Sequence, residues 1–197
     1  MGNSSSSDLL TEINEGSMSS FQVAVIAQCV VINMLDGFDV MVMPFAASSV
    51  ASEWQLTPVY LGLMLTSALL GMAIGSLAIA PLGDLWGRRK LVLGCLGLVT
   101  LGMLCSSQVT HSSQLVLFRF VTGLGIGGML ATLNTLVSEF SNNSRRGLCI
   151  SVLQSAFPLG AILGGIISVY LISNYGWRSL FLFGAIASLV MIPLVYW

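Results

Sequence analysis

Two acidic side chains lie three residues apart in a stretch of the sequence that is otherwise apolar. Asp36 and Asp39 occur in the run VINMLDGFDVMVMPF, residues 31–45. An ionised carboxylate at the centre of a bilayer costs roughly 2.5–3.5 kcal/mol on insertion scales, so a membrane span rarely keeps two for packing alone. Acidic groups in this setting are typical of a transport path or a proton relay. Asp36 and Asp39 are therefore the first candidate site.

The composition is that of an integral membrane protein. Of the 197 residues, 55% are hydrophobic and 8% are charged, whereas a soluble domain carries about 25% charge. The formal net charge of −1 argues against nucleic acid as a partner. Residues 1–20 are polar and lack the basic and apolar parts of a signal peptide, so we expect them to form a disordered cytoplasmic tail.

The sequence contains no pattern that indicates an enzyme or a metal site. The four cysteines have neither metal-ligand nor disulfide spacing and are typical of small buried side chains. His111, the single histidine, falls in a polar loop, and no HExxH, GxSxG or Walker pattern occurs. We expect a protein that is not an enzyme and that needs no cofactor and no metal.

Six apolar runs are long enough to cross a membrane, for which a helix needs about 20 residues. They lie near residues 21–51, 58–80, 90–108, 113–138, 148–172 and 178–197. Thr57 and Pro58 form an N-cap and a first helical position at the start of the second run. The sequence therefore predicts an all-α membrane protein with six transmembrane helices.

Basic residues in the short loops predict the orientation of these helices. The second loop contains RRK (residues 88–90) and the fourth contains RR (residues 145–146), while the first and third loops contain neither Lys nor Arg. Because basic loops stay on the cytoplasmic side, we expect a multi-pass protein of the plasma (inner) membrane with a cytoplasmic N-terminus.

A weak internal repeat divides the six spans into two units of three. Gly71 and Gly75 of the second run recur as Gly160 and Gly164 of the fifth, at an offset of about 89 residues. An odd number of spans per unit inverts the second copy in the membrane, as in secondary transporters. Small residues at these positions would also let helices pack closely, and the two interpretations are compatible.

The same repeat relates the first span to the fourth, which contains Arg119, and relates Arg88 to Arg178. Asp36 and Asp39 share a helix face because they are three residues apart. A cavity between the first and fourth spans would then hold two acids and one base, whose charges compensate. Arg119 could instead be a structural pairing partner, but the combination favours a functional site.

The turn APLGDLWGRRK at residues 80–90 resembles a signature of the major facilitator superfamily, found there between helices 2 and 3. Asp84, Gly87, Arg88 and Arg89 match it, while the first glycine and the first arginine of the signature differ. The resemblance implies a conformational latch, in which charge pairs at this turn stabilise the outward-facing state. Such positive charges also act as a topology signal.

Two further segments resemble the same superfamily. Arg119 with Gly123, Gly125 and Gly127, in FRFVTGLGIGG, resembles its fourth-helix signature Arg-x-x-x-Gly-x-Gly. Glu139 before the fourth loop and the GWR sequence at residues 176–178 also fit. The resemblance implies that Glu139 takes part in the latch with the arginines of the turn. The glycines expected to pack helices are Gly71, Gly75, Gly123, Gly127, Gly160 and Gly164.

The DGFD sequence at residues 36–39 resembles a motif in helix 1 of the aromatic acid:proton symporters of this superfamily. The resemblance implies import of small organic acids, such as benzoate or hydroxybenzoate, with protons. Burial should let Asp36 or Asp39 bind a proton near neutral pH, and Arg119 could pair with a substrate carboxylate or tune the acids. The alternatives are a sugar or organic-cation carrier of the same superfamily and a non-transporting membrane fragment.

Members of the superfamily have twelve spans in two halves, with the substrate between them. Residues 21–197 correspond by this resemblance to the N-terminal six-helix half, built as two inverted three-helix repeats. The expected partners are a small organic anion, protons, membrane lipid, and either a missing C-terminal half or a second copy of this half.

Overall fold

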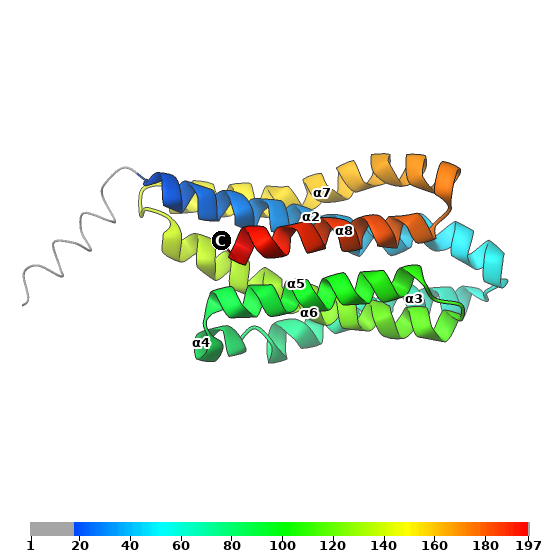
Figure 1. The fold of residues 1–197 in the computed structure, drawn as a ribbon. Helices are drawn as coiled ribbons and strands as arrows, with labels where there is room; N and C mark the ends of the chain where they lie inside the picture. Colours follow the sequence, from blue (N-terminus) through cyan, green and yellow to red (C-terminus); the bar gives the residue numbers. More distant parts are fainter. Residues whose placement is uncertain (1–17, 197) are drawn as a thin grey trace, which may run out of the picture.

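The computed structural model describes residues 18–196, and within this range all the regular secondary structure is helical. Six helices are long and apolar enough to cross a membrane, and α4 is a single short turn between two of them (Figure 1). The helices are α2 (Ser20–Trp54), α3 (Pro58–Ala78), α4 (Leu82–Trp86), α5 (Arg88–Ser107), α6 (Ser112–Phe140), α7 (Arg146–Tyr175) and α8 (Arg178–Tyr196). The predicted fold class is confirmed. Residues 1–17 of the predicted tail lie outside the described residues.

Local sequence signals account for the starts of the first two helices. Ser19 and Gln22 form a capping box at the start of α2. Thr57 caps α3, and Pro58 is its first residue, as predicted. The turn predicted at residues 80–90 instead contains α4 and the first residues of α5. The two helices meet at Gly87, whose φ of 89° is one that L side chains rarely adopt.

The six long helices run side by side along one axis, so the chain traverses the bundle six times (Figure 1). One end contains α4, the start of α5 and the end of α6, and we call it the Arg88 end. The opposite end contains the end of α2 and the start of α8, and we call it the Glu53 end. With 35 residues, α2 is about 52 Å long and exceeds the ~30 Å hydrocarbon core of a bilayer.

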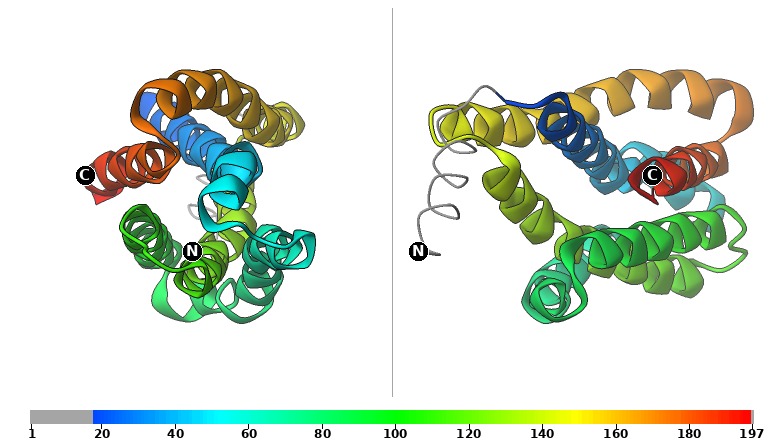
Figure 2. Two further views of the ribbon diagram at one scale, coloured as in Figure 1. Left: turned by 90° about the vertical axis from the view of Figure 1, so that its right-hand side faces the viewer. Right: turned by 60° about the vertical axis from the view of Figure 1, so that its left-hand side comes forward.

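The closest helix pairs each join one helix from the first sequence repeat to one helix from the second. In the end-on view of Figure 2, α7 and α8 lie on one side of α2 and α6, and α3 and α5 lie on the other. The most extensive contacts join α3 to α6 and α2 to α7. The first helix of each repeat therefore packs on the second helix of the other repeat.

Glycines bring the paired helices into backbone contact. On α3 and α6, a Cβ added at Gly71, Gly75, Gly123 or Gly127 would overlap a backbone carbonyl of the facing helix. Gly160 of α7 lies in the same way against the carbonyl of a residue in α2. Four of the predicted packing glycines are thus on the α3–α6 contact, where close approach leaves no room for a side chain.

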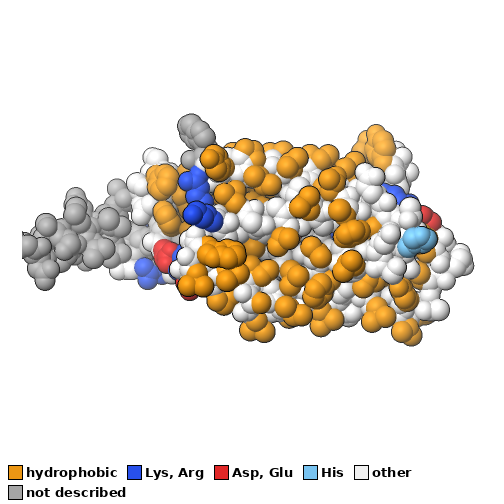
Figure 3. Space-filling view, turned by 60° about the horizontal axis from the view of Figure 1, so that its bottom comes forward, with side chains coloured by type: hydrophobic (Ala, Val, Ile, Leu, Met, Phe, Trp, Pro, Cys, Tyr) orange, Lys and Arg blue, Asp and Glu red, His pale blue; other side chains and the backbone are white. Residues whose placement is uncertain are grey.

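The outer surface is apolar between the two ends of the bundle. On the face shown in Figure 3, charged side chains lie near the ends and hydrophobic side chains cover the region between them. Exposed apolar residues include Leu69 and Ile74 on α3 and Ile162 and Ile166 on α7. A belt of this kind fits a lipid environment better than water.

Candidate functional site

The two predicted acids lie in the middle of α2, inside the bundle. The side chains of Asp36 and Asp39 belong to residues that are each 1% exposed. Within residues 18–196, no group hydrogen-bonds to either carboxylate oxygen of Asp39 or to Oδ2 of Asp36. The carboxylate of Asp39 faces α8, because a Cβ added at Gly184 would lie 2.7 Å from Asp39 Oδ1. Both acids are therefore enclosed by helices and do not point into lipid.

Arg119 of α6 is also 1% exposed and reaches toward the same helices. Its Nη1 donates to the backbone carbonyl of Asp39 at 3.3 Å. Its Nη2 donates to Thr122 Oγ1 at 3.3 Å and to the sulfur of Met103. The guanidinium lies 4.8 Å from the ring centroid of Phe181, on α8. Residues of α2, α5 and α8 thus surround one buried positive charge.

The structure brings Arg119 and Asp39 together, but through the backbone of Asp39. Among the ion pairs of the described residues, none joins Arg119 to an aspartate. The carboxylates of Asp36 and Asp39 keep acceptor atoms free for a proton or another donor, while Arg119 supplies compensating charge nearby. In this conformation the guanidinium is enclosed by protein.

Asn33 is a fourth buried polar residue of this region and is not among the site residues predicted from the sequence. It is 1% exposed and lies one helical turn before Asp36. Its Nδ2 donates to the carbonyl of Leu153 on α7 at 2.6 Å. Its spacing of three residues from Asp36 is the signal that could have identified it. Phe181 carries no such signal, because only tertiary packing places it.

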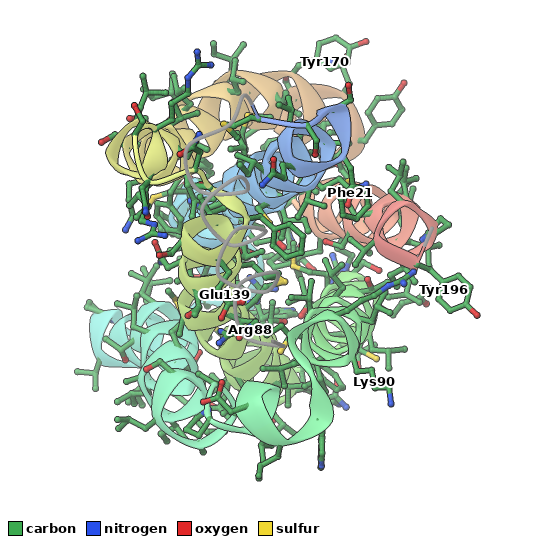
Figure 4. All side chains as sticks on the ribbon, turned by 90° about the vertical axis from the view of Figure 1, so that its left-hand side faces the viewer. Phe21, Arg88, Lys90, Glu139, Tyr170 and Tyr196 are labelled. Atoms are coloured by element: carbon green, nitrogen blue, oxygen red, sulfur yellow. The ribbon has the colours of Figure 1, made fainter. Side chains whose placement is uncertain are left out.

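An ion-pair cluster occupies the Arg88 end. Arg88 Nη2 lies 2.8 Å from Glu139 Oε1 and 3.4 Å from Asp84 Oδ1, and Figure 4 shows Arg88 and Glu139 close together at this end. The side chain of Asp84 is 75% exposed and that of Glu139 49%. A cavity of about 310 Å³, lined in part by Asp84, Arg88 and Thr132, adjoins the cluster. The structure thus brings three of the predicted latch residues together.

The other basic residues of the turn lie elsewhere. Arg89 Nε donates to the carbonyl of Val195 at 3.1 Å, and its guanidinium lies 5.6 Å from the ring centroid of Tyr196. Lys90 points away from the bundle in Figure 4. Arg89 therefore contacts the end of α8 and forms no ion pair with Glu139, for which Arg88 is the partner among the described residues.

A second ion pair lies at the Glu53 end of the bundle. Arg178 Nη2 lies 2.9 Å from Glu53 Oε1, and Arg178 Nη1 donates to Oε2 at 3.1 Å. Trp177 Nε1 donates to the same Oε2 at 2.6 Å, and Arg178 also bonds the carbonyl of Val109 at 3.3 Å. The repeat predicted that Arg178 corresponds to Arg88, but it named no partner for Arg178. The positions of the two acids are nevertheless equivalent. Glu53 is the penultimate residue of α2, and Glu139, the partner of Arg88, is the penultimate residue of α6.

Comparisons with known proteins agree with this architecture. The chain is 38% identical to the 4-hydroxybenzoate transporter PcaK of Acinetobacter baylyi over 192 residues, which cover 97% of the chain and 42% of that protein. It is 31% identical to the gallate transporter of Pseudomonas putida over 190 residues, covering 96% of the chain and 42% of that protein. The chain thus spans less than half the length of these relatives.

Solved structures show the same fold. The xylose transporter XylE from E. coli superimposes with a TM-score of 0.81 at 20% identity, over 90% of this chain and 50% of that one. Residues 29–197 match the sequence profile of the Major Facilitator Superfamily. With six apolar helices in this arrangement and a family match over most of its length, the chain belongs to the Major Facilitator Superfamily.

Proposed function

We propose that this chain is the N-terminal half of a proton-coupled symporter that imports small organic acids, with aromatic acids such as benzoate or hydroxybenzoate as the substrate class. The observation that carries the proposal is the buried carboxylate of Asp39, whose two oxygens have no hydrogen-bond donor among the described residues. The names of the similar proteins, transporters of 4-hydroxybenzoate and gallate, support the substrate class.

Proton coupling follows from the cost of an ionised carboxylate in a closed apolar site. A buried charge without donors is unfavourable, and a bound proton removes that cost. In the proposed cycle, Asp36 or Asp39 takes up a proton while the site is open to water, and the neutral site can then close and reorient. Arg119 balances the remaining negative charge and is the candidate contact for the substrate carboxylate in a more open state.

The ion pairs at the Arg88 end are proposed to act as the latch of the outward-facing state. In this proposal the Arg88 end and the N-terminus are cytoplasmic, in agreement with the basic loops at residues 88–90 and 145–146. Arg88 holds α5 to the end of α6 through Glu139 and to α4 through Asp84. Breaking these pairs would let the end of the bundle open.

The complete transporter would need a second six-helix half. The exposed apolar faces of α3 and α7 could be covered by that half and by lipid. We propose that a C-terminal half, or a second copy of this half, completes the substrate cavity. Substrate would then bind between the two halves, near the level of Asp36 and Asp39 on α2, and alternating access would follow by rocking about this level.

The test is uptake of radiolabelled 4-hydroxybenzoate by the full-length protein in proteoliposomes with an inward proton gradient. Asp36→Asn and Asp39→Asn should each abolish accumulation against the concentration gradient. Gly97→Ala is a matched control, because a Cβ there meets no atom of the described residues within 4 Å. Competition by benzoate, but not by a quaternary amine or xylose, is expected. Unchanged proton-driven accumulation in both aspartate variants would overturn the proposal.

A further inference from the structure

Helix α7 contains a proline in its interior, at Pro158, and Figure 1 shows α7 bending along its length. A proline has no N–H, so the carbonyl of Gln154 loses its helical donor, and the ring pushes the preceding turn open. Leu153 precedes Gln154 in that turn, and its carbonyl oxygen has a second lone pair that can accept from a donor on another helix.

Asn33 of α2 supplies such a donor. Its Nδ2 donates to the Leu153 carbonyl at 2.6 Å, inside the bundle. The backbones of α2 and α7 touch just beyond this bond along both helices, since Gly37 lies against the carbonyl of Phe157 and Gly160 against a carbonyl of α2. Asn33 thus bonds the two helices at the point where α7 bends.

The bond lies close to the proposed proton site. Asn33 precedes Asp36 by three residues, and Asp36 precedes Asp39 by three, so the three side chains lie on successive turns of α2. A shift of α2 relative to the bend of α7 would therefore move both carboxylates. Such a shift would change their distance from Arg119, which is held on α6.

We infer that Asn33 is a positioning residue for proton coupling: by holding the Leu153 carbonyl beside the Pro158 bend, it sets where α2 presents Asp36 and Asp39. This inference rests on the proposed function. It differs from a simple packing role, because the need for Asn33 should depend on the bend of α7. Without the proline, α7 would straighten and carry the Leu153 carbonyl away from Asn33, so that Asn33 could no longer act on α7.

The experiment is a double-mutant cycle in the full-length protein, with Asn33→Leu, Pro158→Ala and the combination. Uptake kinetics and their pH dependence are measured in proteoliposomes. We expect Asn33→Leu to lower kcat about tenfold and to displace the pH profile, with KM changed less than about threefold. In the Pro158→Ala background, Asn33→Leu should lower kcat by less than about threefold. Equal losses in both backgrounds, or an unchanged pH profile, would overturn the inference.

A distance measurement tests the same bond without transport. Spin labels at Val31 of α2 and Tyr175 at the far end of α7, both exposed, report the bend in a background without other cysteines. Asn33→Leu should shift or broaden the distance distribution, and Pro158→Ala should remove that difference. An unchanged distribution in Asn33→Leu contradicts the inference. If the wild-type protein accumulates no organic acid, the proposed function fails, while the distances still decide whether Asn33 controls the bend.

Discussion

Glu53 and Arg178 join the end of α2 to the start of α8 through two contacts, of 2.9 and 3.1 Å. At the opposite end of the bundle, Arg88 and Glu139 join the start of α5 to the end of α6 at 2.8 Å. Each ion pair therefore connects the first helix of one repeat to the third helix of the other. The two repeats are therefore connected by ion pairs at both ends of the bundle.

The pair at the Glu53 end should contribute to stability. Glu53→Gln removes the charge, while the amide oxygen can still accept from Trp177. Because both side chains of the ion pair are 40% exposed, we expect a loss of about 1 kcal/mol or less. That corresponds to a decrease of at most about 2 °C in the Tm of the detergent-solubilised full-length protein. Thermal unfolding followed by tryptophan fluorescence measures it.

Salt provides the internal control for this prediction. The difference between wild type and Glu53→Gln should shrink at 1 M salt, since screening weakens exposed ion pairs. Ser48→Ala, at an exposed position of the same helix, should leave Tm nearly unchanged at both salt concentrations. Equal Tm values for wild type and Glu53→Gln at low salt would contradict a stabilising role for the Arg178 pair.

The space around the Asp39 carboxylate is predicted to be critical for transport. A Cβ at Gly184 would lie 2.7 Å from Asp39 Oδ1 and would overlap the terminal methyl of Met103. Gly184→Ala should displace the carboxylate and lower proton-driven uptake at least about tenfold. Gly97→Ala adds the same methyl to α5 in open space and should retain uptake. Equal uptake by the two variants would show that the site tolerates the methyl.

Apolar length and helix caps predict most of the fold, because a bilayer requires spans of a fixed minimum length and leaves polar breaks between them. The positions of Asp36, Asp39 and Arg119 inside the membrane follow from the same pattern. The contact between the Arg119 guanidinium and the ring of Phe181 could not be predicted, since it depends on how α6 and α8 pack. The helical structure of residues 82–86 was missed because five residues show no periodicity.

The two acids at the Arg88 end should act through one arginine. Arg88 contacts both Asp84 and Glu139, so removal of either charge weakens the same proposed latch. We expect Asp84→Asn and Glu139→Gln each to slow turnover several-fold, with little change in substrate binding. The fold decrease in turnover of the double variant should be smaller than the product of the fold decreases of the two single variants. Uptake rates and equilibrium binding of 4-hydroxybenzoate, measured for all four proteins, complete the cycle.

Arg89→Gln is the matched control for this cycle. Arg89 carries the same charge on the same helix, but within residues 18–196 it bonds the carbonyl of Val195 and pairs with no acid. The fold loss in uptake rate caused by Arg89→Gln should therefore multiply with the fold loss caused by Glu139→Gln. Strict additivity of Asp84→Asn and Glu139→Gln in free energy would mean that the two acids do not share Arg88.

The glycine contact between α3 and α6 should be the least tolerant of added volume. A Cβ at Gly123 would overlap the carbonyl of Ala68, and a backbone carbonyl cannot move aside without displacing α3. We expect Gly123→Ala to lose about 1–3 kcal/mol of stability. In Gly94→Ala, on α5, the added Cβ meets no atom of the part of the chain that the structure describes within 4 Å, and the variant should be neutral or stabilised by up to about 1 kcal/mol through helix propensity. Thermal unfolding of the two full-length variants decides the point, and a Gly123→Ala protein as stable as Gly94→Ala would show that α3 and α6 can separate at little cost.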